Sequence, residues 1–245
     1  MAHSWMPGAR RIRAGADGGS LRGGAPRAVW LTLGTVPGAV SIQSVATRLI
    51  AEGRPCHLIW DPVTGEIAQL ISALRAGCAL GVTEHAAVSA ITRTALGGAA
   101  RGAPSLVRGA AATNVNREGR LCVQIGVLGH PGDPFTNGPL AGVAAIVSWL
   151  DSWNVPRRWP AGPPAEQHAP GAAARGRALW ALGGHFGASQ VPGCPSRGPG
   201  RIDIDRITGT HVLPFYHREP RYSLFPAVLA PGPGVDRNAP LALHG

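Results

Sequence analysis

The side chains that could support chemistry in this sequence are few, and their spacing is irregular. Cys56, Cys78, Cys122 and Cys194 show neither Cys-x-x-Cys nor zinc-finger spacing, so a structural zinc site built on cysteine is not predicted. Cys122 lies in an apolar run, which indicates a buried thiol. Free cysteines without a disulfide framework are typical of a reducing compartment.

Two further groupings occur in or beside the loop GGHFGASQVPGCPSRGPGRID, residues 183–203. His185 and Cys194 could form a cysteine–histidine nucleophile pair, although no third group that would orient them is evident. Asp203 and Asp205 could act as paired carboxylates, but capping of a short helix is the simpler interpretation. The loop has the glycines and prolines of a site loop and few polar side chains for chemistry.

The segments that must position these residues alternate between strand and helix patterns. In residues 120–129 the apolar side chains alternate with a period of two, which predicts the most buried strand. The order of elements predicts an α/β domain over residues 27–208, with a mixed central β-sheet flanked by helices. The predicted strands are 28–34, 56–60, 66–71, 120–129 and 179–186, and the predicted helices are 41–51, 140–153 and one turn at 204–207.

The whole chain has 35 glycines and 23 prolines, which approaches a low-complexity composition, so we expect an ordered centre with irregular flanking segments. We predict a disordered N-terminal segment over residues 1–26 and a Pro/Gly-rich tail over 209–245. Within the domain we predict a flexible insertion at about 83–113 and a Pro-rich linker at 157–175.

The formal net charge is +10, and all 23 basic residues are arginines. They are scattered, apart from Arg10, Arg11 and Arg13, so no specific nucleic-acid site is predicted, whereas acidic wall polymers remain possible partners. No apolar run of about 18 residues occurs, which predicts no membrane span. No secretory signal pattern is visible, so we expect a protein that is cytoplasmic or is released by another route. We also expect a monomer.

Five segments, taken in order, resemble the type 2 N-acetylmuramoyl-L-alanine amidases and the related peptidoglycan-recognition proteins, especially their actinobacterial and phage members. They are AVWLTLGTVPG, PCHLIWDPVTGEIAQLI, NREGRLCVQIGVLG, SWLDSWNVPRRWPAGPP and GGHFGASQVPGCPSRGPGRIDI. The resemblance implies that family's fold. In the family, zinc held by two His and one Asp or Cys activates a water, and an acidic residue assists hydrolysis of the muramoyl–L-alanine amide.

The family's functional positions fall on residues that cannot perform this chemistry. The two zinc-binding histidines correspond to Leu31 and Ala188, the aspartate to Gly198 and the assisting acid to Gly126. A polar position just before the aspartate corresponds to Ser196. Leu, Ala and Gly offer no donor to a metal, so we expect no intact catalytic residue, no metal and no cofactor where the family has zinc.

The sequence therefore predicts a peptidoglycan-binding protein of the amidase fold that is catalytically inactive. Two alternatives stay open: an active cell-wall amidase whose metal site is rebuilt from His57, His185 or Cys194, and a degenerate sequence without function. Arg117 could meet a peptide carboxylate. The residues expected to line the substrate groove are His57, Trp60, Asn116, Gln124, His185 and Gln190.

Overall fold

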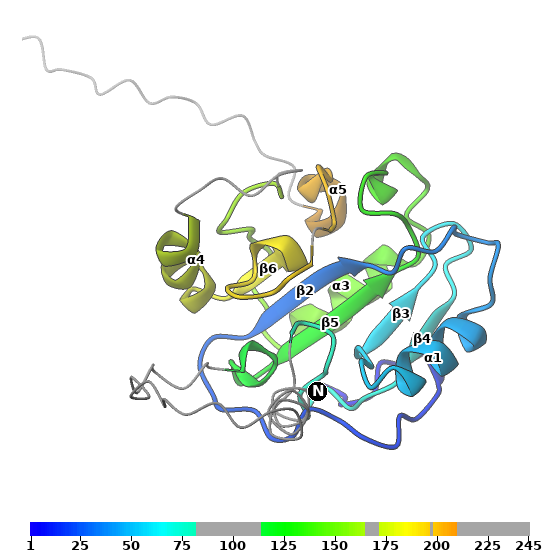
Figure 1. The fold of residues 1–245 in the computed structure, drawn as a ribbon, viewed down its shortest axis with the longest axis horizontal. Helices are drawn as coiled ribbons and strands as arrows, with labels where there is room; N and C mark the ends of the chain where they lie inside the picture. The colour runs from blue at the N-terminus through cyan, green and yellow to red at the C-terminus, as the bar shows by residue number, and fades with distance from the viewer. Residues whose placement is uncertain (82–113, 165–171, 197, 210–245) are drawn as a thin grey trace, which may run out of the picture. The chain divides into compact units, whose positions relative to one another are not determined.

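The computed structural model describes residues 1–81, 114–164, 172–196 and 198–209, all within one compact unit (Figure 1). The predicted insertion at 83–113 lies outside the described residues. So do residues 165–171 of the predicted linker and all of the predicted tail after Gly209. No helix among the described residues has the length and apolar character that crossing a membrane requires.

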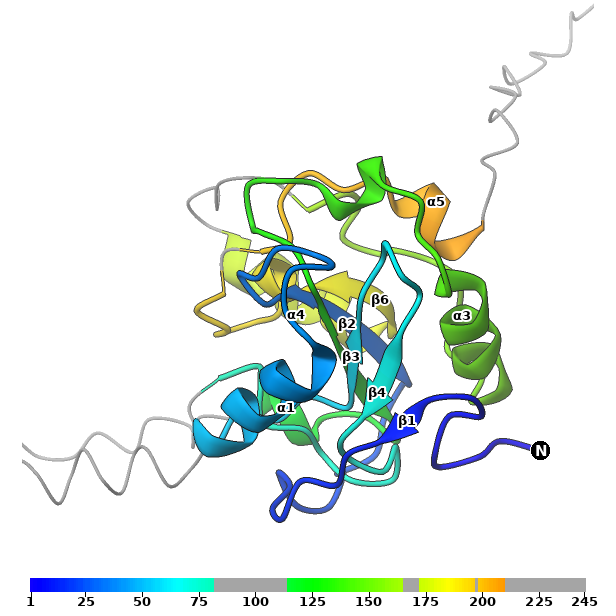
Figure 2. The same cartoon turned by 90° about the vertical axis from the view of Figure 1, so that its right-hand side faces the viewer.

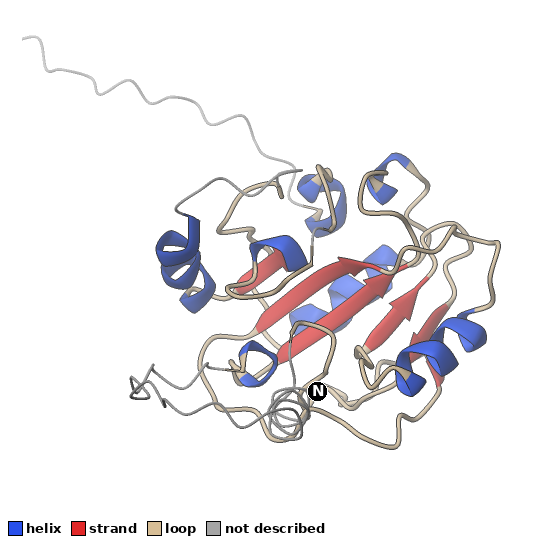
Figure 3. Cartoon of the chain, in the orientation of Figure 1, coloured by secondary structure: helices blue, strands red, loops and turns tan. Residues whose placement is uncertain are grey.

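A mixed sheet of six strands, in the order β1-β4-β3-β5-β2-β6, forms the centre of the described chain (Figure 3). Strands β3, β5, β2 and β6 run parallel, β4 is antiparallel to β3, and β1 is parallel to β4. The strands are β1 (Arg10–Arg11), β2 (Arg27–Thr32), β3 (Leu58–Trp60), β4 (Ile67–Gln69), β5 (Cys122–Val127) and β6 (Gly184–Gly187). The predicted α/β class with a mixed sheet is confirmed.

Helices cover both faces of this sheet, and Figure 2 shows the strands between α1 and α3. The side chains of α1 pack with Val29 and Leu31 of β2, whereas those of α3 pack with Ala28 and Trp30 on the opposite face. The helices are α1 (Ile42–Ala51), α3 (Val143–Ser152), α4 (Ala172–Ala181) and α5 (Ile204–Thr208), with 3-10 turns η1 (Val115–Arg117), η2 (Phe135–Asn137) and η3 (Ala188–Gln190).

Local sequence signals explain the elements that were predicted correctly. Ser41 caps α1, because its hydroxyl accepts a hydrogen bond from the Ser44 amide at 3.2 Å. Gly53, with a φ of +67°, follows the end of α1 in the left-handed region that glycine favours. Asp61 closes the hairpin between β3 and β4 by accepting from the Val63 amide at 2.8 Å.

The prediction that residues 1–26 are disordered is wrong for the structure. This segment contributes β1 to the sheet edge, and Met6 is buried in the cluster beneath α3. The indole nitrogen of Trp149 donates to the His3 carbonyl at 2.8 Å. A few large apolar anchors and backbone hydrogen bonds therefore order a segment whose composition indicates irregular chain.

The predicted strand at 179–186 is also corrected. Residues 172–181 form α4, and β6 begins only at Gly184. Gly183 and Gly184 have φ values of +72° and +104°, so the chain turns sharply between helix and strand at two positions where only glycine is unstrained. The described part of the predicted linker is ordered too, since Trp159 is buried there.

Candidate functional site

The positions that the resemblance assigns to a zinc site lie together at the carboxyl ends of β2, β5 and β6. Leu31 pairs in register with Gly126 of β5, and Trp30 pairs with Gly187, the residue before Ala188. Leu31 and Ala188 belong to the same buried cluster. The segments after β2 and β5 lead to helices on opposite faces, an arrangement that opens a crevice at the carboxyl ends of parallel strands.

Gly198 joins this group through the backbone, because its carbonyl accepts a hydrogen bond from the Ser189 amide at 2.9 Å. A side chain at Gly198 would not point toward Leu31, as a metal ligand at this position would have to. A Cβ atom added at Gly198 would overlap the Thr32 hydroxyl oxygen, so a side chain there would meet Thr32 first. The Thr32 hydroxyl is itself buried and has no hydrogen-bond partner among the described residues.

The space beside Gly126, the position that the resemblance assigns to an assisting acid, is filled by Leu33 and Cys56. A Cβ atom at Gly126 would lie 2.9 Å from Leu33 Cδ1 and 3.0 Å from Cys56 Sγ. Burial raises the pKa of the Cys56 thiol to about 12, so this sulfur is a neutral packing group at ordinary pH. The site interior thus has the chemistry of a hydrophobic core.

The residues present do not fit a zinc ion. Leucine, glycine and alanine at the corresponding positions supply no electron pair for the metal. Across residues 1–81, 114–164, 172–196 and 198–209, no three His, Cys, Asp or Glu side chains cluster closely enough to hold a metal. No step through zinc can be derived for this chain.

A surface hollow of about 230 Å³ lies beside Leu31, on the face of the sheet covered by α1. The guanidinium of Arg48 is fixed at its edge, where it donates to the Leu33 carbonyl at 3.3 Å and to the Thr35 hydroxyl at 3.2 Å. Arg54 is exposed and makes no ion pair among the described residues. The lining residues are Leu31, Thr32, Leu33, Arg48, Leu49, Glu52, Arg54, Ala79 and Ser196.

Five of the six predicted groove residues are buried and do not line the hollow beside Leu31. The side chains of His57, Trp60, Asn116, Gln124 and His185 belong to residues that are at most 1% exposed. Gln190, the sixth residue, is half-buried. These residues support the scaffold, because their side-chain polar atoms form internal hydrogen bonds, except for His185 Nε2, which is buried without a partner among the described residues.

His57 illustrates this internal role. Its Nδ1 accepts a hydrogen bond from the Gln124 amide at 3.0 Å, and its Nε2 donates to the Arg75 carbonyl at 2.8 Å. Burial lowers the pKa of His57 to about 4, so the imidazole is neutral at pH 7. Both ring nitrogens are occupied by backbone groups, which leaves neither for a metal or a ligand.

Gln124 and Asn116 fix the segment that follows the β-hairpin. The Gln124 side-chain oxygen accepts from the Ala79 amide at 2.9 Å, and its nitrogen donates to Asn116 Oδ1 at 2.8 Å. Asn116 Oδ1 also accepts from the Leu80 amide at 3.0 Å. Unpaired polar groups are costly when buried, so this network stabilises one position of residues 79–80.

The other three predicted groove residues support the opposite face and the loop after β6. Trp60 donates through its indole nitrogen to the Ala141 carbonyl at 2.7 Å. Gln190 Oε1 accepts from the Trp159 indole at 2.6 Å and from the Gly187 amide at 2.9 Å. His185 stacks on Trp30, with ring centroids 6.0 Å apart, and its Nδ1 accepts from the Trp30 indole.

The residues proposed for alternative chemistry are not brought together. His185 packs between Trp30 and Trp159, in contact with the cluster beneath α3, whereas Cys194 belongs to the cluster beneath α1. Burial raises the pKa of the Cys194 thiol, which opposes thiolate formation. The sheet therefore separates the two members of the hypothetical nucleophile pair.

Two further sequence interpretations can be placed. Asp203 caps α5, since its carboxylate accepts from the amides of Asp205 and Arg206, each at 3.1 Å, as predicted. Arg117 donates to the Ser20 carbonyl at 2.8 Å and so anchors the N-terminal segment.

Arg48 and Arg54 are the site residues that sequence reasoning missed. For Arg48 the sequence offered one signal, because Arg48 and Glu52 are four residues apart and so share the polar side of an amphipathic helix. Comparisons of the chain with protein-family models, with curated proteins and with solved structures find no match.

Proposed function

We propose that this chain binds peptidoglycan fragments in the hollow beside Leu31 and does not hydrolyse them. Support comes from one observation above all. The hollow of about 230 Å³ includes Leu31 and Ser196, two of the positions that the resemblance assigns to the family's reaction centre. A cleft at the position of a reaction centre, without donors for a metal, is suited to binding and not to catalysis.

The charges at the hollow suit a peptide with free carboxylates. Arg54 provides a guanidinium that can form two parallel hydrogen bonds with a carboxylate, which is the stronger kind of ion pair. Arg48 is already oriented by two hydrogen bonds, so little side-chain entropy would be lost if it contacted a ligand. The apolar side chains of Leu31 and Leu49 can contact the methyl groups of alanine residues.

The test is calorimetric titration of the purified protein with a soluble muramoyl peptide at moderate ionic strength. We expect saturable binding and no release of stem peptide, with or without added zinc. Arg54→Glu should weaken binding by at least about tenfold, the value of one charge-assisted hydrogen bond.

A matched control is Arg120→Glu, because Arg120 is an exposed arginine before β5, at the other end of the strands. It makes the same change in net charge and should leave binding unchanged. Equal weakening by both variants would indicate nonspecific attraction, and no binding by the unaltered chain would refute the proposal.

A further inference from the structure

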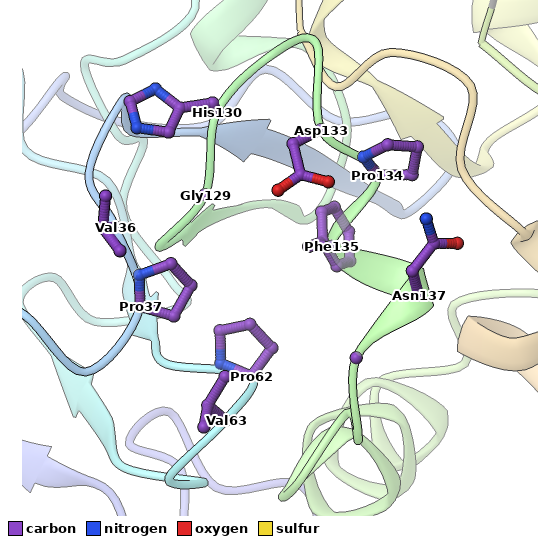
Figure 4. A pocket seen from close by; sticks show the side chains of 11 residues that line it. Val36, Pro37, Pro62, Val63, Gly129, His130, Asp133, Pro134, Phe135 and Asn137 are labelled. Carbon is purple, nitrogen blue, oxygen red and sulfur yellow. The ribbon is translucent and has the colours of Figure 1, made fainter.

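A second hollow, of about 240 Å³, lies at the carboxyl ends of the same parallel strands but shares no lining residue with the first. Figure 4 shows that its walls come from three separate loops. Val36 and Pro37 follow β2, Pro62 and Val63 belong to the turn after β3, and the third loop follows β5. Its formation thus depends on the folded sheet.

Two walls of this hollow are apolar. Val36 and Val63 are 54% and 50% exposed, which places them among the most exposed large apolar side chains of the described residues. The two prolines beside them stiffen the loops that carry them. Exposed apolar side chains that gather around one concavity favour a ligand with a hydrocarbon body.

The third wall adds a single formal charge. Among the described residues that line the hollow, Asp133 is the only Asp, Glu or Arg. Figure 4 shows its carboxylate directed toward the open space near the Phe135 ring. Among the described residues the Asp133 carboxylate accepts no hydrogen bond and forms no ion pair, and the Asp133 amide donates to the His130 carbonyl at 3.1 Å. On a chain with a formal net charge of +10, this hollow is locally acidic.

These features define one class of ligand. A carboxylate beside apolar walls complements a cation whose hydrocarbon part can contact valine and proline. The hollow has one phenyl ring, that of Phe135, and the imidazole of His130, which do not make the cage of Trp and Tyr rings that a quaternary ammonium prefers. A primary ammonium, which can donate hydrogen bonds to the carboxylate, fits better. The volume is below the ~300–1,000 Å³ of sites for drug-sized molecules, so the ligand is small.

We propose that the hollow between Val36, Val63 and Asp133 binds a small ligand that carries a primary ammonium on a hydrocarbon body. The ammonium pairs with Asp133, and the hydrocarbon part packs against the valines and prolines. This site is independent of the proposed peptidoglycan binding, because different residues line the two hollows.

The experiment is a titration of the ¹⁵N-labelled protein with hexylamine, followed by chemical-shift changes, in parallel with hexanol and hexanoate. We expect saturable shifts from hexylamine at residues of the three loops, with weaker binding of hexanol and none of hexanoate. Asp133→Asn should weaken hexylamine binding by about tenfold and remove the preference over hexanol.

Two controls separate this site from the rest of the molecule. Glu52→Gln removes an exposed carboxylate from the first hollow and should leave hexylamine binding unchanged. Val36→Ser should weaken hexylamine and hexanol alike, because it removes apolar contact only. The inference is overturned if hexylamine does not bind, if its shifts lie elsewhere, or if Asp133→Asn binds it as well as the unaltered chain does.

Discussion

Acidification from pH 7 to pH 4 should destabilise this fold strongly, because two imidazoles are buried in neutral form. Burial is the main cause that lowers the pKa values of His57 and His185, each from 6.5 to about 4. The unfolded chain takes up these protons near pH 6.5, whereas the folded chain resists them until about pH 4. The contribution of the two histidines to the free energy of unfolding is therefore fully present above pH 6.5. It is lost between pH 6.5 and about 4, and below pH 4 these residues cause no further loss.

The magnitude follows from the size of the shifts. A difference between 6.5 and about 4 corresponds to about 3 kcal/mol for each histidine, at ~1.4 kcal/mol per pH unit. The two losses together, ~6 kcal/mol, are comparable to the entire stability of a typical domain, ~5–15 kcal/mol. The exposed pair of Asp17 and Arg75 does not contribute in this window, because the pKa of Asp17 is lowered below 3.8.

The assay is urea denaturation followed by tryptophan fluorescence, from pH 4.5 to 7.5 at constant ionic strength. The free energy of unfolding should fall with decreasing pH, with a limiting slope near two protons per molecule. His57→Gln and His185→Asn should each lower the stability at pH 7 and remove about half of the slope.

Stability that stays constant between pH 7 and 4.5 would refute the reasoning. In that case both imidazoles would be accessible to water or would have charged partners, because a single buried neutral imidazole would still give about half of the slope. The two histidines would then regain their predicted place in an open groove. The same titration thus decides between a core role and a ligand-binding role for these residues.

Further predictions concern close packing, the buried amides and the N-terminal segment. Gly198→Ala should destabilise the fold by ~1–3 kcal/mol in urea denaturation, because the added Cβ would overlap Thr32, whereas Gly132→Ala, where nothing lies within 4 Å, should have little effect. Gln124→Ala should cost ~2–4 kcal/mol in the same assay, since it leaves buried polar partners unsatisfied. Deleting residues 1–9 should lower the thermal midpoint, measured by circular dichroism, because it uncovers buried apolar surface beside α3.

The elements that were predictable from the sequence are those in which the hydrophobic periodicity agrees with the residues that begin and end helices and strands. In β5 and the residues that flank it, the side chains of Leu121 and Val123 face one cluster and those of Cys122 and Leu128 face the other, as the alternation predicts. In α4 the two signals disagree. The run around Leu179 and Trp180 reads as a strand, but the Ala/Arg-rich context favours the helix that forms.

The roles of the polar residues could not be obtained in this way. A glutamine on a central strand has the same local pattern whether its amide lines a groove or pairs inside the core. For Gln124 the outcome is decided by Ala79, 45 residues away in the sequence. For His57 it is decided by Arg75, whose carbonyl accepts from the imidazole. Such partners come from the tertiary fold, and no periodicity reports them.

The packing around Gly126 and Gly198 bears on our proposal of an amidase-like fold without metal donors. A reaction centre that had only lost its ligands would keep the space for their side chains, at the cost that cavities carry. Here Leu33 and Cys56 fill the space beside Gly126, and Thr32 fills that beside Gly198. No space for a side chain therefore remains beside Gly126 or Gly198. This complementarity maintains a stable framework around the hollow beside Leu31, and a binding function at that hollow requires such a framework.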